Sequence, residues 1–457
     1  MSAFQIALES GDVEHNEAPL ANGEETHTVA NAIAEAQDLA QEAADEDQVA
    51  DKLEAEQEQV EDLAGEVEET IAQEGALDAT AARILRTAFS NIVGKRYAAK
   101  SLPATESFEG TRAAGREATQ IALESIKETL KKFWDAIKAQ FKKVYQKVKD
   151  WMVKTFSAAK KLKDRAEKIQ KRAGETTGTI EEKSFSFGQT KTIAVEGKYN
   201  DAGALTSSLN KLRNTIKSTI TELKKDDVDG EIEKTVNALK AAFKANGSQR
   251  NLGNIDGLVS AVKGAVKGAG TVPGSVGDVT KYKAQFGEAT EVDVTGLFGL
   301  PGGKAIIVVT PKGKATSIEQ GVKTLKGSKL ILGSDKYTAR DVTDGEVKTL
   351  TVSQADKVCD DVIEIAETIY DFEKNWKEND KLVEKVQREV DDIVKEFDQE
   401  DDATSGDKRY FRNFCTAAVG AIRRQSQFKA QLCQYGLTTG NAFLNYAERS
   451  LSQHKTK

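Results

Sequence analysis

The stretch SIKETLKKFWDAIKAQFKKVYQKVKDWMVKTFSAAKKLKDRAEKIQKR, residues 125–172, decides the fold. Apolar residues recur along it in steps of three and four, the spacing of one face of an α-helix. They are Ile126, Leu130, Phe133, Trp134, Ile137, Phe141, Val144, Tyr145, Val148, Trp151, Met152 and Phe156. The same stretch carries 16 Lys and Arg against 5 Asp and Glu. An unbroken helix of this length would extend about 72 Å, and its aromatic stripe needs a partner.

The segment before this helix has the opposite charge. Residues 1–106 contain 24 Asp and Glu against 6 Lys and Arg, a net charge of −18. A thin stripe of larger apolar residues, formed by Val49, Leu53, Val60, Leu63, Val67 and Ile71, follows a roughly helical spacing. Such a segment buries too little apolar area to offset the cost of ordering unless it has a partner. We therefore expect an acidic leader, residues 1–106, that is largely disordered or transiently helical.

The remaining chain divides into three further regions. Residues 107–180 form the basic amphipathic helical region, and residues 353–457 have helical spacing again, with Val362, Ile365, Ile369 and Trp376 on one face. Residues 181–352 combine helical segments with short β-branched runs bounded by Gly and Pro. The expected fold class is α+β but mostly helical. A long basic helix and C-terminal helices surround a small α+β domain, after a disordered acidic leader.

The composition argues against an enzyme, a cofactor and a metal. The three histidines lie near the chain ends, so a histidine base or histidine metal site in the middle of the chain is not available. Three cysteines without C-x-x-C spacing suit free thiols. The glycine-rich segment 296–305 has Phe298 and Ala305 where a phosphate-binding loop needs Gly and Ser or Thr, so we interpret it as a turn between strands. The sequence contains no run of 18 or more apolar residues, so it predicts no membrane-spanning helix.

The basic helix has three interpretations. It can be a packed helix with solvated lysines, a nucleic-acid contact through phosphates, or a membrane-surface helix. Lysine greatly outnumbers arginine, which suits non-specific charge neutralisation better than base recognition. The candidate DNA-contacting residues are Lys131, Lys132, Lys138, Lys142, Lys143, Lys147, Lys149, Lys160, Lys161 and Lys163. The whole chain has a net charge of −8, whereas residues 107–457 alone have +10, so the acidic segment would mask a basic body.

The hexapeptide QIALES occurs twice, at residues 5–10 and 120–125. Each copy contains an Ala-x-Glu site, and these sites, the acidic Ala/Glu-rich leader and the lysine-aromatic helix resemble the internal head proteins of giant phiKZ-type tailed phages. That resemblance implies a leader removed by a prohead protease that cuts after a small residue, any residue and Glu. Ala104-Thr105-Glu106 fits, which places the expected cut between Glu106 and Ser107; the two QIALES copies offer Glu9 and Glu124 as alternatives.

The resemblance implies a virion structural protein packed inside the phage head with the genome and present in the host cytoplasm during assembly. Its expected partners are double-stranded DNA bound without sequence preference, the prohead protease, and other head proteins or further copies of itself. Two alternatives remain: a prohead core or scaffold protein that acts through helix–helix and coiled-coil contacts, and an ejected membrane-active effector. No cofactor is expected.

Overall fold

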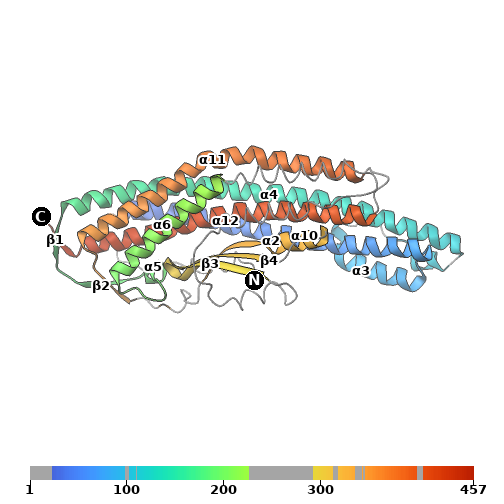
Figure 1. Ribbon diagram of the computed structural model, residues 1–457, viewed down its shortest axis with the longest axis horizontal. Helices are drawn as coiled ribbons and strands as arrows, with labels where there is room; N and C mark the ends of the chain where they lie inside the picture. Colours follow the sequence, from blue (N-terminus) through green and yellow to red (C-terminus); the bar gives the residue numbers. More distant parts are fainter. Residues whose placement is uncertain are drawn as a thin grey trace.

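The protein is an elongated assembly of long helices (Figure 1). The computed structural model describes residues 23–97, 102–109, 111–225, 292–311, 318–334, 342, 345–398 and 405–456. Four helices run along the molecule and pack on one another: α2 (Gly23–Glu74), α4 (Arg112–Glu175), α11 (Val352–Asp398) and α12 (Ser405–Leu451). The prediction of a mostly helical chain with small sheets is confirmed. Within the described ranges, no helix combines the length and hydropathy needed to cross a bilayer.

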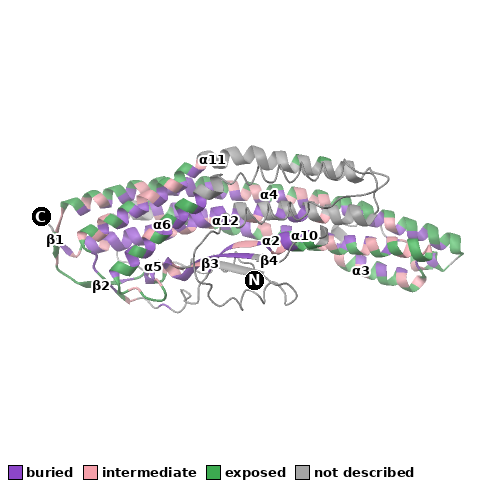
Figure 2. Ribbon diagram, in the orientation of Figure 1, coloured by how far each residue is buried: buried purple, intermediate pink, exposed green. Residues whose placement is uncertain are grey.

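Helix α4 is the helix that the opening stretch predicts, extended at both ends. It begins after Thr111, whose side chain accepts a hydrogen bond from the backbone N–H of Ala114. No proline interrupts it, so 64 residues continue for about 96 Å. Its buried residues recur in steps of three and four, which appears in Figure 2 as a buried stripe along the ribbon.

The expectation of a largely disordered leader is wrong for residues 23–97, because they form helices α2 and α3 (Ala79–Tyr97). Helix α4 supplies the partner that α2 needs. The buried face of α2 also differs from the apolar stripe predicted for it, because Val49, a member of that stripe, is 43% exposed. The buried face consists largely of alanines, joined by Val29, Ile33, Leu53, Val60 and Val67; the alanines are Ala32, Ala36, Ala40, Ala43, Ala44, Ala50 and Ala64. Small side chains let the two helices approach closely, so alanine makes an interface here.

Helix α2 ends in a tight turn at Gly75, where φ is +82°, a conformation that favours glycine. Helix α3 follows, and its first turn is capped by Asp78, which accepts a hydrogen bond from the N–H of Ala81. The short 3-10 turn η1 (Thr105–Phe108) then leads into α4. Leu77, Phe89, Leu102, Phe108 and Phe133 belong to the buried cluster that ties this end together.

In the described ranges, three small antiparallel sheets lie beside the long helices. Strand β1 (Thr176–Ile180) pairs with β7 (His454–Thr456), and β2 (Ser184–Phe187) pairs with β6 (Gly345–Lys348). The third sheet has the order β3 (Val292–Leu300), β4 (Lys304–Pro311), β5 (Lys329–Ser334). The turn η2 (Pro301–Gly303) joins β3 to β4, as predicted for the glycine-rich segment.

Three shorter helices complete the described fold: α5 (Thr190–Ile193), α6 (Ala202–Lys225) and α10 (Ile318–Gly327). Helix α6 agrees with the apolar spacing of its sequence and packs on α11 and α12. Residues 226–291, part of the region in which further helical segments are expected, lie outside the described residues.

The aromatic stripe of α4 is buried, but against two different partners. Trp151 and Phe156 share a cluster with residues of α11, namely Val362, Ile365 and Ile369, and with alanines of α2. The side chain of Trp376 lies outside the described residues. Phe133 and Ile137 instead share the cluster that contains residues of α2 and α3. The leader therefore contributes to the cover of both halves of the stripe, whereas α11 contributes to one.

Candidate functional site

The ten candidate lysines lie along α4 but differ in exposure. Six are exposed: Lys131, Lys132, Lys142, Lys143, Lys160 and Lys161. The other four are half-buried: Lys138, Lys147, Lys149 and Lys163. Their positions span about 48 Å of helix, so they form a long charged edge rather than one compact pocket.

The acidic helix α2 neutralises part of this edge directly. Lys143 lies 2.6 Å from Glu46, and Lys154 lies 2.8 Å from Glu35. Lys147 pairs with Glu42, and Lys127 pairs with Glu68 at 2.9 Å. As the residue numbers of the partners rise along α2, those along α4 fall, so the two helices are antiparallel. The charged residues lie beside the apolar faces of both helices. We call these four pairs the α2–α4 ion-pair edge.

Electrostatics within this edge favour the charged forms. The hydrogen bond from Lys154, together with its charge, holds the pKa of Glu35 below its ordinary value. Burial alone would raise the pKa of Glu46, but hydrogen bonds from Lys143 and Gln140 outweigh it and lower the pKa. The hydrogen bond to Glu42 likewise raises the pKa of Lys147. Ion pairs as exposed as these add little to the stability of a fold, and salt weakens them further.

A second charged cluster, which sequence reasoning missed, joins α2 to α12. The side chain of Arg423 is 3% exposed, and its guanidinium pairs with three carboxylates of α2, those of Asp47, Asp51 and Glu54. We call this group the Arg423 cage. A signal for it exists in the sequence. Asp47, Glu54 and Glu61 stand seven residues apart and continue the buried stripe of α2, where a carboxylate needs a cationic partner.

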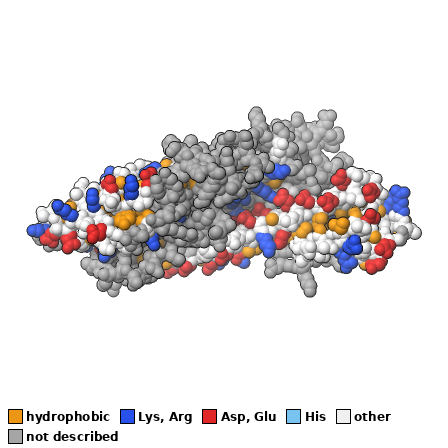
Figure 3. Space-filling model, turned by 90° about the horizontal axis from the view of Figure 1, so that it is seen from below, with side chains coloured by type: hydrophobic (Ala, Val, Ile, Leu, Met, Phe, Trp, Pro, Cys, Tyr) orange, Lys and Arg blue, Asp and Glu red, His pale blue; other side chains and the backbone are white. Residues whose placement is uncertain are grey.

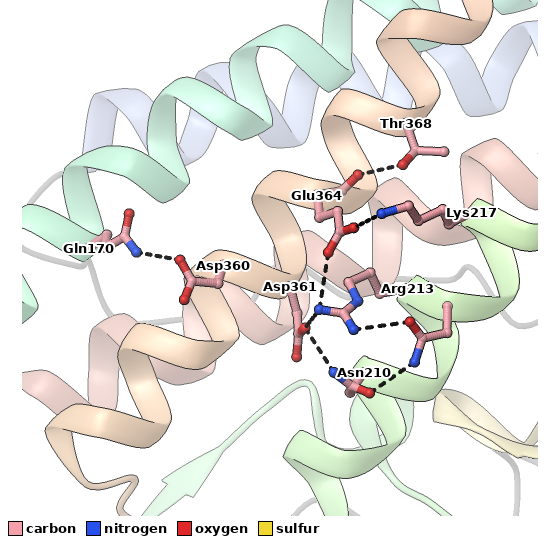
Figure 4. A network of polar contacts seen from close by, with 9 residues as sticks. Gln170, Asn210, Arg213, Lys217, Asp360, Asp361, Glu364 and Thr368 are labelled. Atoms are coloured by element: carbon pink, nitrogen blue, oxygen red, sulfur yellow. Dashed lines mark hydrogen bonds and ion pairs between the residues drawn. The ribbon is translucent and has the colours of Figure 1, made fainter.

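Polar contacts also join helix α6 to helix α11. Figure 4 shows Arg213 of α6 between Asp361 and Glu364 of α11, at 2.9 and 3.1 Å. Asn210 donates a hydrogen bond to Asp361, and Lys217 pairs with Glu364. These contacts lie between two packed helices, so their role is to fix α6 on α11. Within the described residues, no group of three or more His, Cys, Asp or Glu is arranged to hold a metal.

The expected cleavage site lies in the turn η1. Glu106 and Ser107 are both exposed, and the backbone before them is extended at Ala104. Leu102 and Phe108 are buried on either side and hold the turn against the helices. Of the alternatives, Glu124 lies inside α4 beside the fully buried Ala122, and Glu9 lies outside the described residues.

On the face shown in Figure 3, acidic and basic side chains are interspersed over the described residues. Long helices packed lengthwise, with an acidic helix lying along a basic one, define an elongated helical structural protein. The family model of phiKZ-like phage internal head proteins matches residues 29–449, and the chain belongs to that family. The match begins inside α2, so the acidic helix is part of the family's common region. No curated protein and no solved structure matches the chain.

Proposed function

We propose that this internal head protein is a structural component of the phage head that contacts the packaged genome without sequence preference. The family gives the structural role and the head location. The observation that supports the genome contact is the basic edge of α4, whose exposed lysines recur over many turns. Repeated lysines suit a DNA backbone because each contact with a phosphate releases counterions, whatever the base sequence.

A matched pair of triple variants tests this contact. One variant replaces Lys142, Lys160 and Lys161 of α4 by Gln, and the other replaces Lys191, Lys198 and Lys455, which are exposed elsewhere. Both variants carry three fewer positive charges. The α4 variant should bind duplex DNA more weakly, and its dependence on salt should flatten by about 0.9 in log–log slope for each phosphate that it no longer neutralises. Equal weakening in the two variants would contradict a contact through α4.

We further propose that a prohead protease cuts the chain between Glu106 and Ser107. The exposure of both residues in a short turn supports this position, because nicking concentrates where backbone is accessible. Mass measurement of the protein from its native particle should find a chain beginning at Ser107. A particle protein that still begins at Met1 or Ser2 would contradict processing. A chain beginning at Ser125 would show that the protease cuts after Glu124, in the second QIALES copy.

A further inference from the structure

The Arg423 cage belongs to a larger group of cations beneath α2. Arg424 follows directly on α12, and its guanidinium donates a hydrogen bond to the backbone carbonyl of Leu325 at 3.3 Å. Lys326 at the end of α10 pairs with Glu58 at 2.8 Å. Lys329 of β5 is close enough for Arg424 to lower its pKa, although burial is the larger cause. We call Arg423, Arg424, Lys326 and Lys329 the basic cluster.

The carboxylates that face this cluster come from one segment of the chain. Asp47, Asp51, Glu54 and Glu58 all lie within about three turns of α2. The body of the protein therefore contributes the cations from α12, α10 and β5, and α2 contributes the anions. Arginine's planar group pairs with carboxylate and phosphate oxygens in the same geometry, so these carboxylates occupy positions where phosphate oxygens would also bind.

The burial of the arginines makes an anion necessary. Two adjacent guanidiniums repel each other, and burial together with the charge of Arg423 lowers the pKa of Arg424. Burial opposes the charge of Arg423 as well, but the attraction of Glu54, Asp47 and Asp51 outweighs it and raises that pKa. Gly420 leaves room for this arrangement, since a Cβ there would lie 3.3 Å from both Arg424 and Glu54.

The carboxylates are themselves held at a cost. Burial raises the pKa of Asp47 and of Glu54, and Arg423 only partly offsets it. The buried apolar residues beside them in α2 are Ala43, Ala44, Ala50 and Leu53, so this part of the interface has only one large apolar side chain to hold it. A polyanion that supplies phosphates to the arginines can therefore replace these carboxylates and return them to water.

We propose that the basic cluster is a phosphate-binding site for nucleic acid and that residues 47–58 of α2 occupy it as an internal competitor. This inference rests on the proposed genome contact and adds a site that α4 alone does not provide. DNA would first meet the exposed lysines of α4 and then displace the central part of α2. The acidic helix thereby sets the affinity of the uncut chain for DNA.

Two full-length triple variants with the same change in charge test the competition. The cage variant carries Asp47→Asn, Asp51→Asn and Glu54→Gln. The control carries Asp38→Asn, Glu66→Gln and Glu74→Gln, which are exposed on α2 outside the cage. The cage variant should bind duplex DNA at least about tenfold more tightly than the control at the same salt concentration. Adding Arg423→Gln and Arg424→Gln to the cage variant should remove that gain.

Equal affinities of the two triple variants, or a gain that survives both arginine replacements, would overturn the proposed site. Hydrogen exchange of the unmodified protein provides a measurement that does not depend on how the variants fold. Added duplex DNA should speed exchange in residues 47–58, and unchanged protection in that segment would count against competition. If the unmodified protein and the control both fail to bind DNA at low salt, the proposed genome contact itself is wrong. If the protein binds DNA but the cage variant and the control bind equally well, the proposed genome contact stands and only the phosphate-binding site is refuted.

Discussion

The two sides of helix α4 are held by different kinds of contact. Toward α11 and α12 it buries large side chains, including the fully buried Trp151 and Met152, in a cluster to which alanines of α2 also belong. Toward α2 it meets a row of alanines edged by ion pairs. The first interface depends on apolar volume, which salt and pH hardly change, whereas the second depends partly on charge, which both change. One helix thus joins an interface held by apolar volume to an interface that depends partly on charge.

Removing the largest side chain from the apolar side should have the largest effect. Trp151→Ala is expected to lower the free energy of unfolding by about 3–5 kcal/mol. Trp151 is 1% exposed, and its indole N–H points to Gln434 of α12 at 3.5 Å. Denaturant titration measures the change. Val153→Ala, at a position that is 54% exposed, is the control and should change stability by less than about 0.5 kcal/mol.

The same variant separates packing from membrane binding. Unchanged stability of Trp151→Ala, together with a failure to bind anionic vesicles, would favour the membrane-surface interpretation of α4. It would also refute the interface with α12.

The interface between α2 and α4 should be destabilised by larger side chains at its alanine positions. Ala43 is fully buried on α2, so Ala43→Leu forces the two helices apart and should cost about 1–3 kcal/mol. Ala34→Leu makes the same change at an exposed position of α2 and should be nearly neutral. Thermal unfolding of the two variants measures the difference. If both changes are tolerated equally, α2 does not pack closely against α4.

The ion-pair edge should contribute a smaller, pH-dependent effect. Because the pKa of Glu46 is lower in the folded chain than its ordinary 4.5, its contribution is present above pH 4.5 and disappears as the pH falls through the folded value. Glu46→Gln should therefore lower stability at neutral pH, by about 0.2–1 kcal/mol, and approach the parent protein in acid. Glu66→Gln, exposed on the same helix, is the control. A deficit that persists at low pH would indicate an effect on packing instead of charge.

The two buried cysteines between α11 and α12 should not react with thiol reagents while the protein is folded. Burial raises the pKa of both Cys359 and Cys433 to about 12, and both side chains are 0% exposed. In a Cys415→Ser background, thiol reagents should label neither residue until denaturant is added. Rapid labelling under native conditions would show that the α11–α12 interface opens readily.

The sequence predicts one side of α4 much better than the other. Large apolar residues at helical spacing identify α4, α6 and α11 because few other structures accommodate that pattern. Helix α2 escapes prediction because alanine is compatible with both a solvated helix and a close interface. The pairing of Lys143 with Glu46 was also out of reach, since it depends on the register of two helices that are far apart in the chain.

The candidate sites divide in the same way. The lysines of α4 can be located from composition alone, and the exposed turn at Glu106 from the proline and glycine near it. The Arg423 cage could not be found from α12, where two arginines look like an ordinary polar surface. Only the seven-residue spacing of Asp47 and Glu54 within a buried stripe indicates that a cation must lie opposite.

Hydrogen exchange along α2 of the intact protein in the absence of DNA tests most directly whether the acidic helix is a packed part of the fold. Amides from Val29 to Val67 should be strongly protected, because their helix is buried against α4 and α12. Protection should weaken toward the exposed end at Glu74. Exchange throughout α2 at the rate of an unstructured peptide would contradict the packed helix, and with it the competition proposed for the basic cluster.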